Sequence, residues 1–132
     1  MSDNDLNDDA PMPGGDLALQ TIAMPADTNA NGDIFGGWLV SQMDLAGAIA
    51  ALKIAQGRIA TVAINGMVFL TPVHIGAVVS CYADITEVGR SSVKVNVEVW
   101  IRHKNTQQPT KVTEGEFVFV AIDDSGKTRT IK

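Results

Sequence analysis

The sequence is poor in the residues that build disulfides and metal sites. Its 132 residues include one cysteine, Cys81, so no internal disulfide can form, and a reducing, cytoplasmic setting fits this composition. The two histidines, His74 and His103, are far apart in the sequence, and no further histidine, cysteine or carboxylate stands at the spacing of metal ligands. We therefore predict neither a metal site nor disulfide bonds.

Basic residues are absent from the first 52 positions, which contain eight aspartates. The remaining seven acidic residues and all ten lysines and arginines follow, and the net charge is −5. Nucleic-acid binding is not expected, because it depends on a basic surface. A small anionic ligand held by a few placed cations is compatible with this distribution.

Long apolar runs are also missing. None reaches the roughly 20 residues that span a bilayer, and the most apolar segment, residues 38–55, is interrupted by Ser41, Gln42, Asp44 and Lys53. The N-terminus has neither the basic start nor the apolar core of a secretory signal. Neither a dinucleotide-binding glycine pattern nor a phosphate-binding loop is present. We expect no membrane span and a cytoplasmic location.

The first 15 residues are acidic and rich in Asn, Pro and Gly, which predicts a disordered tail. Across the chain, 45% of residues are hydrophobic and 19% are charged, as in globular proteins. The length is that of one domain, which we place at residues 16–132.

The hydrophobic pattern predicts one helix and several strands. A strand is expected at residues 17–24, a loop at 26–37 and a helix at 38–56 that is apolar around most of its circumference. Strand patterns follow at 59–73 (one strand, or two joined near Asn65), 77–88, 91–102 and 112–122. In the segment 91–102, valine or isoleucine occupies every second position from 93 to 101, which predicts one apolar face. The residues between them are expected on the opposite face.

An apolar sheet face must be covered, and only one helix is available. The predicted fold class is therefore α+β, with an antiparallel sheet wrapped around one long central helix. One helix is a small cover for such a sheet, so we expect the chain to oligomerise.

Asp44 is the one acid inside the apolar helix. An acid shielded from water can serve as a general base. It can equally be an acid at a helix end, or one that accepts a bond from a loop amide.

Gly36 and Gly37 precede the predicted helix. Free backbone amides at a helix start favour negative charge and could stabilise an acyl oxyanion, or the pair could be a plain turn. In the preceding loop, Asn29 and Asn31 could donate to a substrate or tie the loop together through Asx-turns.

The turn Gly89-Arg90-Ser91-Ser92 combines a cation with two hydroxyls. It could hold a phosphate or the polar arm of a ligand, although hairpin turns of this composition are common.

Three segments carry a resemblance: MPADTNANGDIFGGWLVSQMD, GRIATVAINGMVFLTPVHIGAVVSCYADI and VGRSSVKVNVEVW. They resemble the YciA-type branch of the hotdog-fold acyl-CoA thioesterases, over about residues 17–123. The stretch from Asn29 to Asp44 is the specific part, whereas the strand segments alone are weak.

The resemblance implies a homodimer with active sites at the subunit interface, often assembled into a hexamer as a trimer of dimers. It implies hydrolysis of acyl-CoA to a free fatty acid and CoA without a cofactor. Asp44 matches the catalytic carboxylate, as general base or nucleophile, and Asn29 a residue that acts from the facing subunit. Gly36 and Gly37 match the oxyanion site.

The resemblance also places the CoA arm along the turn Gly89–Ser92. For contacts with the CoA phosphates we predict Arg90, together with Arg58, Arg102 or Lys104. Two other functions remain open. One is a non-catalytic module that binds or senses acyl-CoA; the other is a dehydratase, which is disfavoured because the loop and helix segment contains no histidine.

Overall fold

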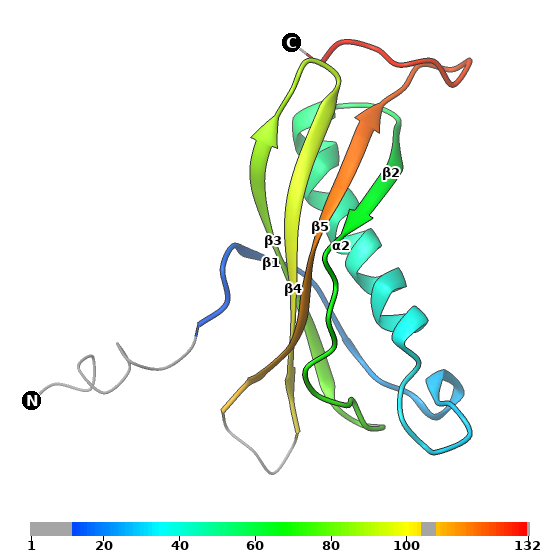
Figure 1. Ribbon diagram of the computed structural model, residues 1–132, viewed down its shortest axis with the longest axis vertical. Coiled ribbons are helices and arrows are strands. Elements are labelled where there is room, and N and C mark those ends of the chain that lie inside the picture. Colours follow the sequence, from blue (N-terminus) through cyan, green and yellow to red (C-terminus); the bar gives the residue numbers. More distant parts are fainter. Residues whose placement is uncertain (1–11, 104–107, 132) are drawn as a thin grey trace, which may run out of the picture.

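The computed structural model describes residues 12–103 and 108–131 (Figure 1). Five antiparallel strands form one sheet in the order β1-β3-β4-β5-β2, and the long helix α2 crosses one face of it (Figure 1). This confirms the predicted fold class. The elements are β1 (Asp16–Ile22), the 3-10 helix η1 (Pro25–Asp27), α2 (Gly36–Ala55), β2 (Ile59–Asn65), β3 (Val78–Val88), β4 (Ser92–Arg102) and β5 (Thr110–Ala121).

The core lies between α2 and the sheet. The valines that alternate along β4 are at most 1% exposed, because successive side chains of a strand point to opposite faces and these point towards the helix. The helix approaches the sheet closely at Gly47, where an added Cβ would lie 3.0 Å from two ring atoms of Phe119. Glycine at this position lets α2 pack tightly against β5.

On the other face of the sheet, Glu98 and Trp100 are buried at 8% and 4% exposure. The Trp100 indole Nε1 donates to Glu98 Oε1 at 2.9 Å, and the Gly14 amide donates to Glu98 Oε2 at 3.2 Å. The segment before β1 therefore contacts the sheet at Gly14. Residues 1–11 of the predicted tail lie outside the described residues.

The helix differs from its prediction in one respect that bears on function. We expected it to be buried around most of its circumference, but Leu45, Ile49 and Leu52 are 53%, 39% and 44% exposed. That expectation is wrong for a single chain, because the sheet covers only one side of α2. The edge strand β2 adds exposed Val62 (58%) and Ile64 (44%) beside it. Apolar surface of this extent is typical of a protein interface.

Of the two alternatives for residues 59–73, a single long strand is wrong, and a break near Asn65 is correct, although no second strand follows it. β2 ends at Asn65, and Gly66 follows with φ +61°, a left-handed conformation that glycine adopts without strain. The chain then leaves the sheet edge and crosses towards the start of α2, where Asp33 and His74 form an isolated bridge. The turn breaks the extended conformation that the apolar pattern predicted.

We expected no segment long and apolar enough to span a membrane. By length and hydropathy alone, however, the 20 residues of α2 meet that condition. It is the one such helix in the described parts of the chain. One side of it packs against the sheet, with Leu39, Met43, Ala46 and Ala51 at most 3% exposed, so α2 belongs to the core of the domain.

Candidate active site

The Asp44 carboxylate lies on the side of α2 that faces the edge strand β2, where it is partly exposed. The hydroxyl of Thr61 donates to Asp44 Oδ1 at 2.7 Å. The β2–β5 register shifts between Thr61 and Ala63, an irregularity of the kind that re-aims side chains near functional sites. The structure thus fixes the orientation of Asp44 through a strand hydroxyl, and its second oxygen accepts no hydrogen bond from residues 12–103 or 108–131.

The start of α2 carries two free backbone amides. Phe35 is the N-cap residue and makes no side-chain capping bond. The amides of Trp38 and Leu39 donate to the Phe35 carbonyl at 3.1 and 3.3 Å. The amides of Gly36 and Gly37 have no acceptor anywhere in residues 12–103 or 108–131. An oxygen that develops negative charge could therefore be stabilised here.

Asn29 ties its own loop together, as the Asx-turn interpretation predicted. Its Oδ1 accepts from the amides of Asn31 at 2.9 Å and Asp33 at 3.1 Å, and its own amide donates to the Asp33 carbonyl at 2.7 Å. With Oδ1 occupied, the side-chain Nδ2 has no acceptor within the described part of the chain. The loop holds Asn29 in a fixed pose with one donor group left over, so the two predicted roles are compatible.

Gly37 and Asp44 are seven residues apart in α2, which places them on the same side of the helix and about 10 Å apart along its axis. Val40 and Ser41 lie on the same side between them. One chain therefore presents the free amides and the carboxylate at separate points along a single helix side.

The turn Gly89–Ser92 lies at the opposite end of the molecule, where α2 ends (Figure 1). The Gly89 amide donates to the Ser92 carbonyl at 2.8 Å, and the Arg90 carbonyl accepts from Ile131 at 2.7 Å. Arg58 follows α2 at this same end and donates to the Asp124 carbonyl at 3.4 Å. Arg90 and Arg58 thus share one end of the fold, away from Gly36 and Gly37.

The other predicted phosphate contacts are not at that end. Arg102 is exposed at the end of β4. It pairs with Val78, the first residue of β3, so it lies at the end of the β3–β4 hairpin that is opposite the turn Gly89–Ser92. Lys104 lies outside the described residues. Among the predicted cations, the structure groups Arg58 with Arg90 and separates Arg102 from both.

The two histidines come together although the sequence keeps them apart. Their ring centroids are 6.0 Å apart, and His74 Nδ1 lies 3.1 Å from Asp33 Oδ1. In the described residues, no three His, Cys, Asp or Glu side chains are grouped so as to hold a metal ion. Cys81 is fully buried, and this burial raises the pKa of its thiol to about 12.

Sequence reasoning missed Thr61. It stands in a run of alternating small and apolar residues, and nothing local in the sequence marks it as a partner of Asp44. Its contact with Asp44 depends on how β2 packs against α2 and on the register irregularity between β2 and β5. Neither feature can be read from the sequence.

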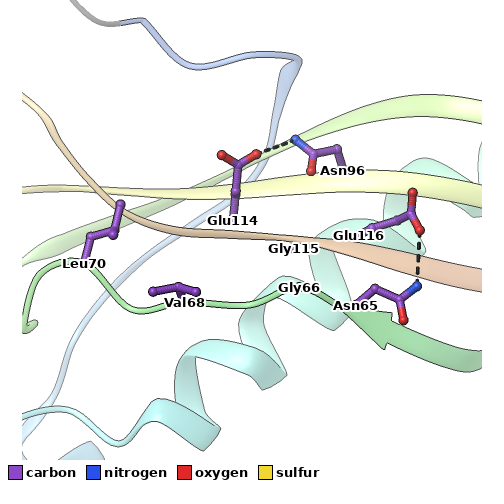
Figure 2. A pocket seen from close by; sticks show the side chains of 8 residues that line it. All are labelled: Asn65, Gly66, Val68, Leu70, Asn96, Glu114, Gly115 and Glu116. Atoms are coloured by element: carbon purple, nitrogen blue, oxygen red, sulfur yellow. Dashed lines mark hydrogen bonds between the residues drawn. The ribbon is translucent and has the colours of Figure 1, made fainter.

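Two cavities flank the segment that follows β2. One, of about 540 Å³, lies where Asn65, Asn96, Glu114 and Glu116 point away from α2 (Figure 2). Asn96 donates to Glu114 at 3.3 Å and Asn65 to Glu116 at 3.2 Å, so its carboxylates already have partners. The other, of about 240 Å³, lies beside the first turn of α2 and is lined in part by Gly36. Only the second adjoins a predicted site residue.

Comparison with known protein families identifies the family to which this fold and sequence belong. A family model described as the thioesterase superfamily matches residues 31–107, more than half of the chain and the whole of α2. The chain belongs to the thioesterase superfamily, and its long helix against a five-stranded antiparallel sheet is the fold of that family.

Individual relatives narrow the comparison. The acyl-CoA thioester hydrolase YciA of Escherichia coli K12 is 54% identical over 123 residues, covering 91% of this chain and 93% of that protein. The crystal structure of the hexameric thioesterase y2039 from Yersinia pestis superposes with a TM-score of 0.87 at 56% identity, covering 92% and 98% of the two chains. That of Cj0915, a hexameric hotdog fold thioesterase of Campylobacter jejuni, gives 0.83 at 40% identity, covering 89% and 91%. The resemblance read from the sequence is confirmed.

Proposed function

We propose that this protein hydrolyses acyl-CoA thioesters to a free fatty acid and CoA, with Asp44 as the catalytic carboxylate. The observation that carries the proposal is that α2 presents both a carboxylate oriented by Thr61 and two unbonded amides at its start, so that two copies of the chain can supply one of each to a shared site. The acyl-CoA thioester hydrolases at 54% identity support the same reaction. The catalytic unit is residues 16–132.

The thioester oxygen binds at the amides of Gly36 and Gly37, where the helix dipole and the free N–H groups stabilise the oxyanion. Asp44 either takes a proton from the attacking water or attacks the carbonyl carbon itself and forms a mixed anhydride that water then cleaves. The Nδ2 group of Asn29 is a further donor beside this centre. No step needs a metal or a redox cofactor, and we assign none.

The amides and the carboxylate that act on one thioester come from two protomers. Within one chain they are about 10 Å apart along the helix axis, and the intervening surface carries Val40 and Ser41. The exposed side of α2 and the edge strand β2, both next to Asp44, are the surfaces that a second copy would cover. Asp44 of one protomer then faces Gly37 and Asn29 of the partner subunit.

The CoA arm is assigned to the end of the fold that carries Arg58 and Arg90. Phosphate groups bind arginine through charge-assisted hydrogen bonds, and Ser91 and Ser92 supply hydroxyls in the same turn. A Cβ on Gly89 would lie 2.6 Å from Oγ of Ser92, so glycine leaves room for that hydroxyl. Contacts of this kind are screened by salt, so the KM for acyl-CoA should rise with ionic strength. A flat salt response would remove the arginines from the assignment.

The assembly we propose is a homohexamer built as a trimer of dimers, because both structural relatives described above are hexameric thioesterases. A cytoplasmic location, in keeping with the single unpaired cysteine, is part of the same proposal.

Thiol release from a series of acyl-CoAs, followed with DTNB, tests the proposed activity. The protein's own thiol does not interfere, since Cys81 is buried and its pKa is raised to about 12. We expect turnover that is proportional to enzyme and abolished by Asp44→Ala. Tight acyl-CoA binding without thiol release would instead identify a binding or sensing module.

A single turnover in ¹⁸O-labelled water separates the two roles of Asp44. Label that enters the Asp44 carboxylate supports the nucleophile, because the mixed anhydride is opened by water. Label found only in the released fatty acid supports the general base.

A further inference from the structure

The loop that carries Asn29, residues 29–33, makes all its hydrogen bonds within itself. In the described parts of the chain, every hydrogen bond of this 29–33 loop joins two of its own members. Asp33 takes part in two of them, because its amide donates to Asn29 Oδ1 at 3.1 Å and its carbonyl accepts from the Asn29 amide at 2.7 Å. The position of Asn29 therefore follows that of Asp33.

The Asp33 side chain makes the one ion pair that links this loop to another segment of the described chain. Its Oδ1 lies 3.1 Å from His74 Nδ1. Their neighbours bring the two residues together, since the Ile34 amide donates to the Val73 carbonyl at 2.9 Å and both of those residues are buried. Asp33 and His74 thus form an isolated antiparallel bridge, with side chains that are 40% and 57% exposed.

His74 belongs to a turn that is bonded to the rest of the fold independently of the 29–33 loop. Its carbonyl accepts from the Ala77 amide at 3.2 Å, and the Gly76 amide donates to the Ala23 carbonyl at 2.8 Å. The Ala23 amide in turn donates to the Ala77 carbonyl at 3.0 Å, and both alanines are fully buried. His74 therefore gives the loop a fixed point of attachment outside itself.

We propose that His74 and Asp33 are a positioning pair, which holds the 29–33 loop so that Asn29 Nδ2 is aimed at the bound thioester. The inference rests on the proposed thioesterase function and adds to its site a residue from outside the loop and α2. His74 does not touch the reacting atoms, and it acts through Asp33 and Asn29. Because an exposed ion pair adds little to stability, its loss should lower turnover and leave the melting temperature close to native.

The second histidine supplies a matched control. The ring centroid of His103 is 6.0 Å from that of His74. Within the residues that the structure describes, however, His103 forms no ion pair with Asp33. His103→Ala therefore removes a ring from the same cluster without removing the contact that holds the loop.

The test is a double-mutant cycle of His74→Ala and Asn29→Ala, measured as kcat and KM for thiol release. The substrate is whichever of acetyl-, butyryl-, octanoyl- and palmitoyl-CoA the native protein hydrolyses fastest. His74→Ala should lower kcat about tenfold, as for a modest misplacement of a reacting group. Its KM should stay within about twofold of native, because CoA phosphate contacts are assigned to the far end of the fold.

The cycle depends on how the two substitutions combine. Asn29→Ala alone should lower kcat about 100-fold, as for loss of a donor to an oxyanion. In the Asn29→Ala background, His74→Ala should change kcat less than about twofold, because the group that His74 positions is already gone. A purely structural role of His74 would lower kcat by the same factor in both backgrounds.

Two further variants test the contact itself. His74→Asn keeps an N–H donor near the position of ring Nδ1 and should recover kcat to within about threefold of native. Asp33→Ala removes the same contact from its other side and should match His74→Ala, and the two substitutions together should be no worse than either alone. Light scattering and melting temperature should be close to native for all of them, because both side chains are partly exposed.

The outcomes separate the inference from the proposed function. An equal loss on replacing His74 in the native and Asn29→Ala backgrounds overturns the inference, because His74 then acts independently of Asn29. Native kcat in both His74→Ala and Asp33→Ala, or the same loss in His103→Ala, also overturns it, and each of these results leaves the proposed function standing.

Two other results would reach further. Native kcat in Asn29→Ala removes Asn29 from the proposed site, and the positioning pair with it. Absence of thiol release by the native protein from every acyl-CoA overturns the proposed function, and the inference fails for that reason alone.

Discussion

The two ends of α2 differ in how their backbone groups are hydrogen-bonded. At the C-terminal end, the Gln56 amide donates to the Leu52 carbonyl at 2.9 Å, and the Arg129 guanidinium donates to the carbonyls of Ala55 at 3.1 Å and Arg58 at 3.4 Å. At the N-terminal end, Gly36 and Gly37 keep free amides and no side chain caps them. A helix leaves unpaired groups at both ends, and this chain satisfies those at the C-terminal end while leaving two amides at the N-terminal end for the proposed thioester oxygen.

The contrast assigns stability to one end and chemistry to the other. Arg129 places positive charge where the helix dipole is negative and ties the C-terminal segment to α2. The open N-terminal end gains no such contact from its own chain, and it lies beside exposed apolar surface. Mutations at the two ends should therefore affect different measurements.

Removal of the carboxylate should have the largest effect. Asp44→Ala is expected to lower kcat at least ~100-fold, the scale of a positioned acid–base group, with little change in the melting temperature because Asp44 is partly exposed. Steady-state thiol release and thermal unfolding measure the two quantities. Asp84→Ala, an equal change of charge at an exposed position of β3, is the control. Turnover close to native in Asp44→Ala would remove this residue from the mechanism.

Closing the open end should come next. Phe35→Asn puts an amide oxygen at the N-cap position, where it can accept from the amide of Gly37 or Trp38. We expect it to stabilise the fold by about 1 kcal/mol relative to Phe35→Ala and to lower kcat about tenfold, because the cap competes with the thioester oxygen. Urea unfolding and steady-state kinetics on both variants separate the effect of losing the Phe35 ring from the effect of adding the cap. A stabilised variant with undiminished kcat would show that these amides are not used.

Loss of the Thr61 hydroxyl should have a smaller effect on turnover. Thr61→Val keeps the shape of the side chain but cannot donate to Asp44, so we expect kcat to fall about fivefold while KM stays within twofold, as for loss of one hydrogen bond worth about 1 kcal/mol. Thr61→Ser keeps the donor and should recover most of the activity. Equal kinetics for the valine and serine variants would contradict a positioning role.

The closed end should respond in stability alone. Arg129→Ala removes the donors to Ala55, Arg58 and Ile122, and we expect it to lower the free energy of unfolding by about 1–2 kcal/mol with kcat unchanged. Urea denaturation measures the loss, and Lys127→Ala on the neighbouring exposed turn is the control. A variant of native stability would mean that the helix end does not depend on Arg129.

The sequence predicted what its local pattern encodes. The alternating valines of β4 predicted a strand with one buried face, and the apolar segment after Gly36-Gly37 predicted the helix to within two residues at its start. The stretch from Asn29 to Asp44 also predicted the family. Each of these depends on neighbours along the chain.

The remainder depends on contacts between distant segments. Thr61 reaches Asp44 because β2 pairs with β5 at the sheet edge, and Arg129 reaches the end of α2 from 74 residues away. The alternative of two strands joined near Asn65 placed the break correctly, since β2 ends there and Gly66 adopts a left-handed conformation, but residues 66–73 form no second strand, which the apolar pattern did not reveal. The exposure of Leu45 and Leu52 was missed because composition does not tell a core from an interface.

Mixing two inactive variants tests most directly whether the open helix end of one protomer serves the carboxylate of another. Asp44→Ala and Asn29→Ala are first prepared separately as homo-oligomers, whose activity is measured for comparison. The two variants are then co-expressed with different tags, so that oligomers containing both can be purified. If each site joins Asp44 of one protomer to Asn29 of the partner subunit, every mixed dimer contains one intact site, and activity should return to about half that of the native dimer. Mixed oligomers no more active than their parents would contradict the account, because each site would then belong to one chain.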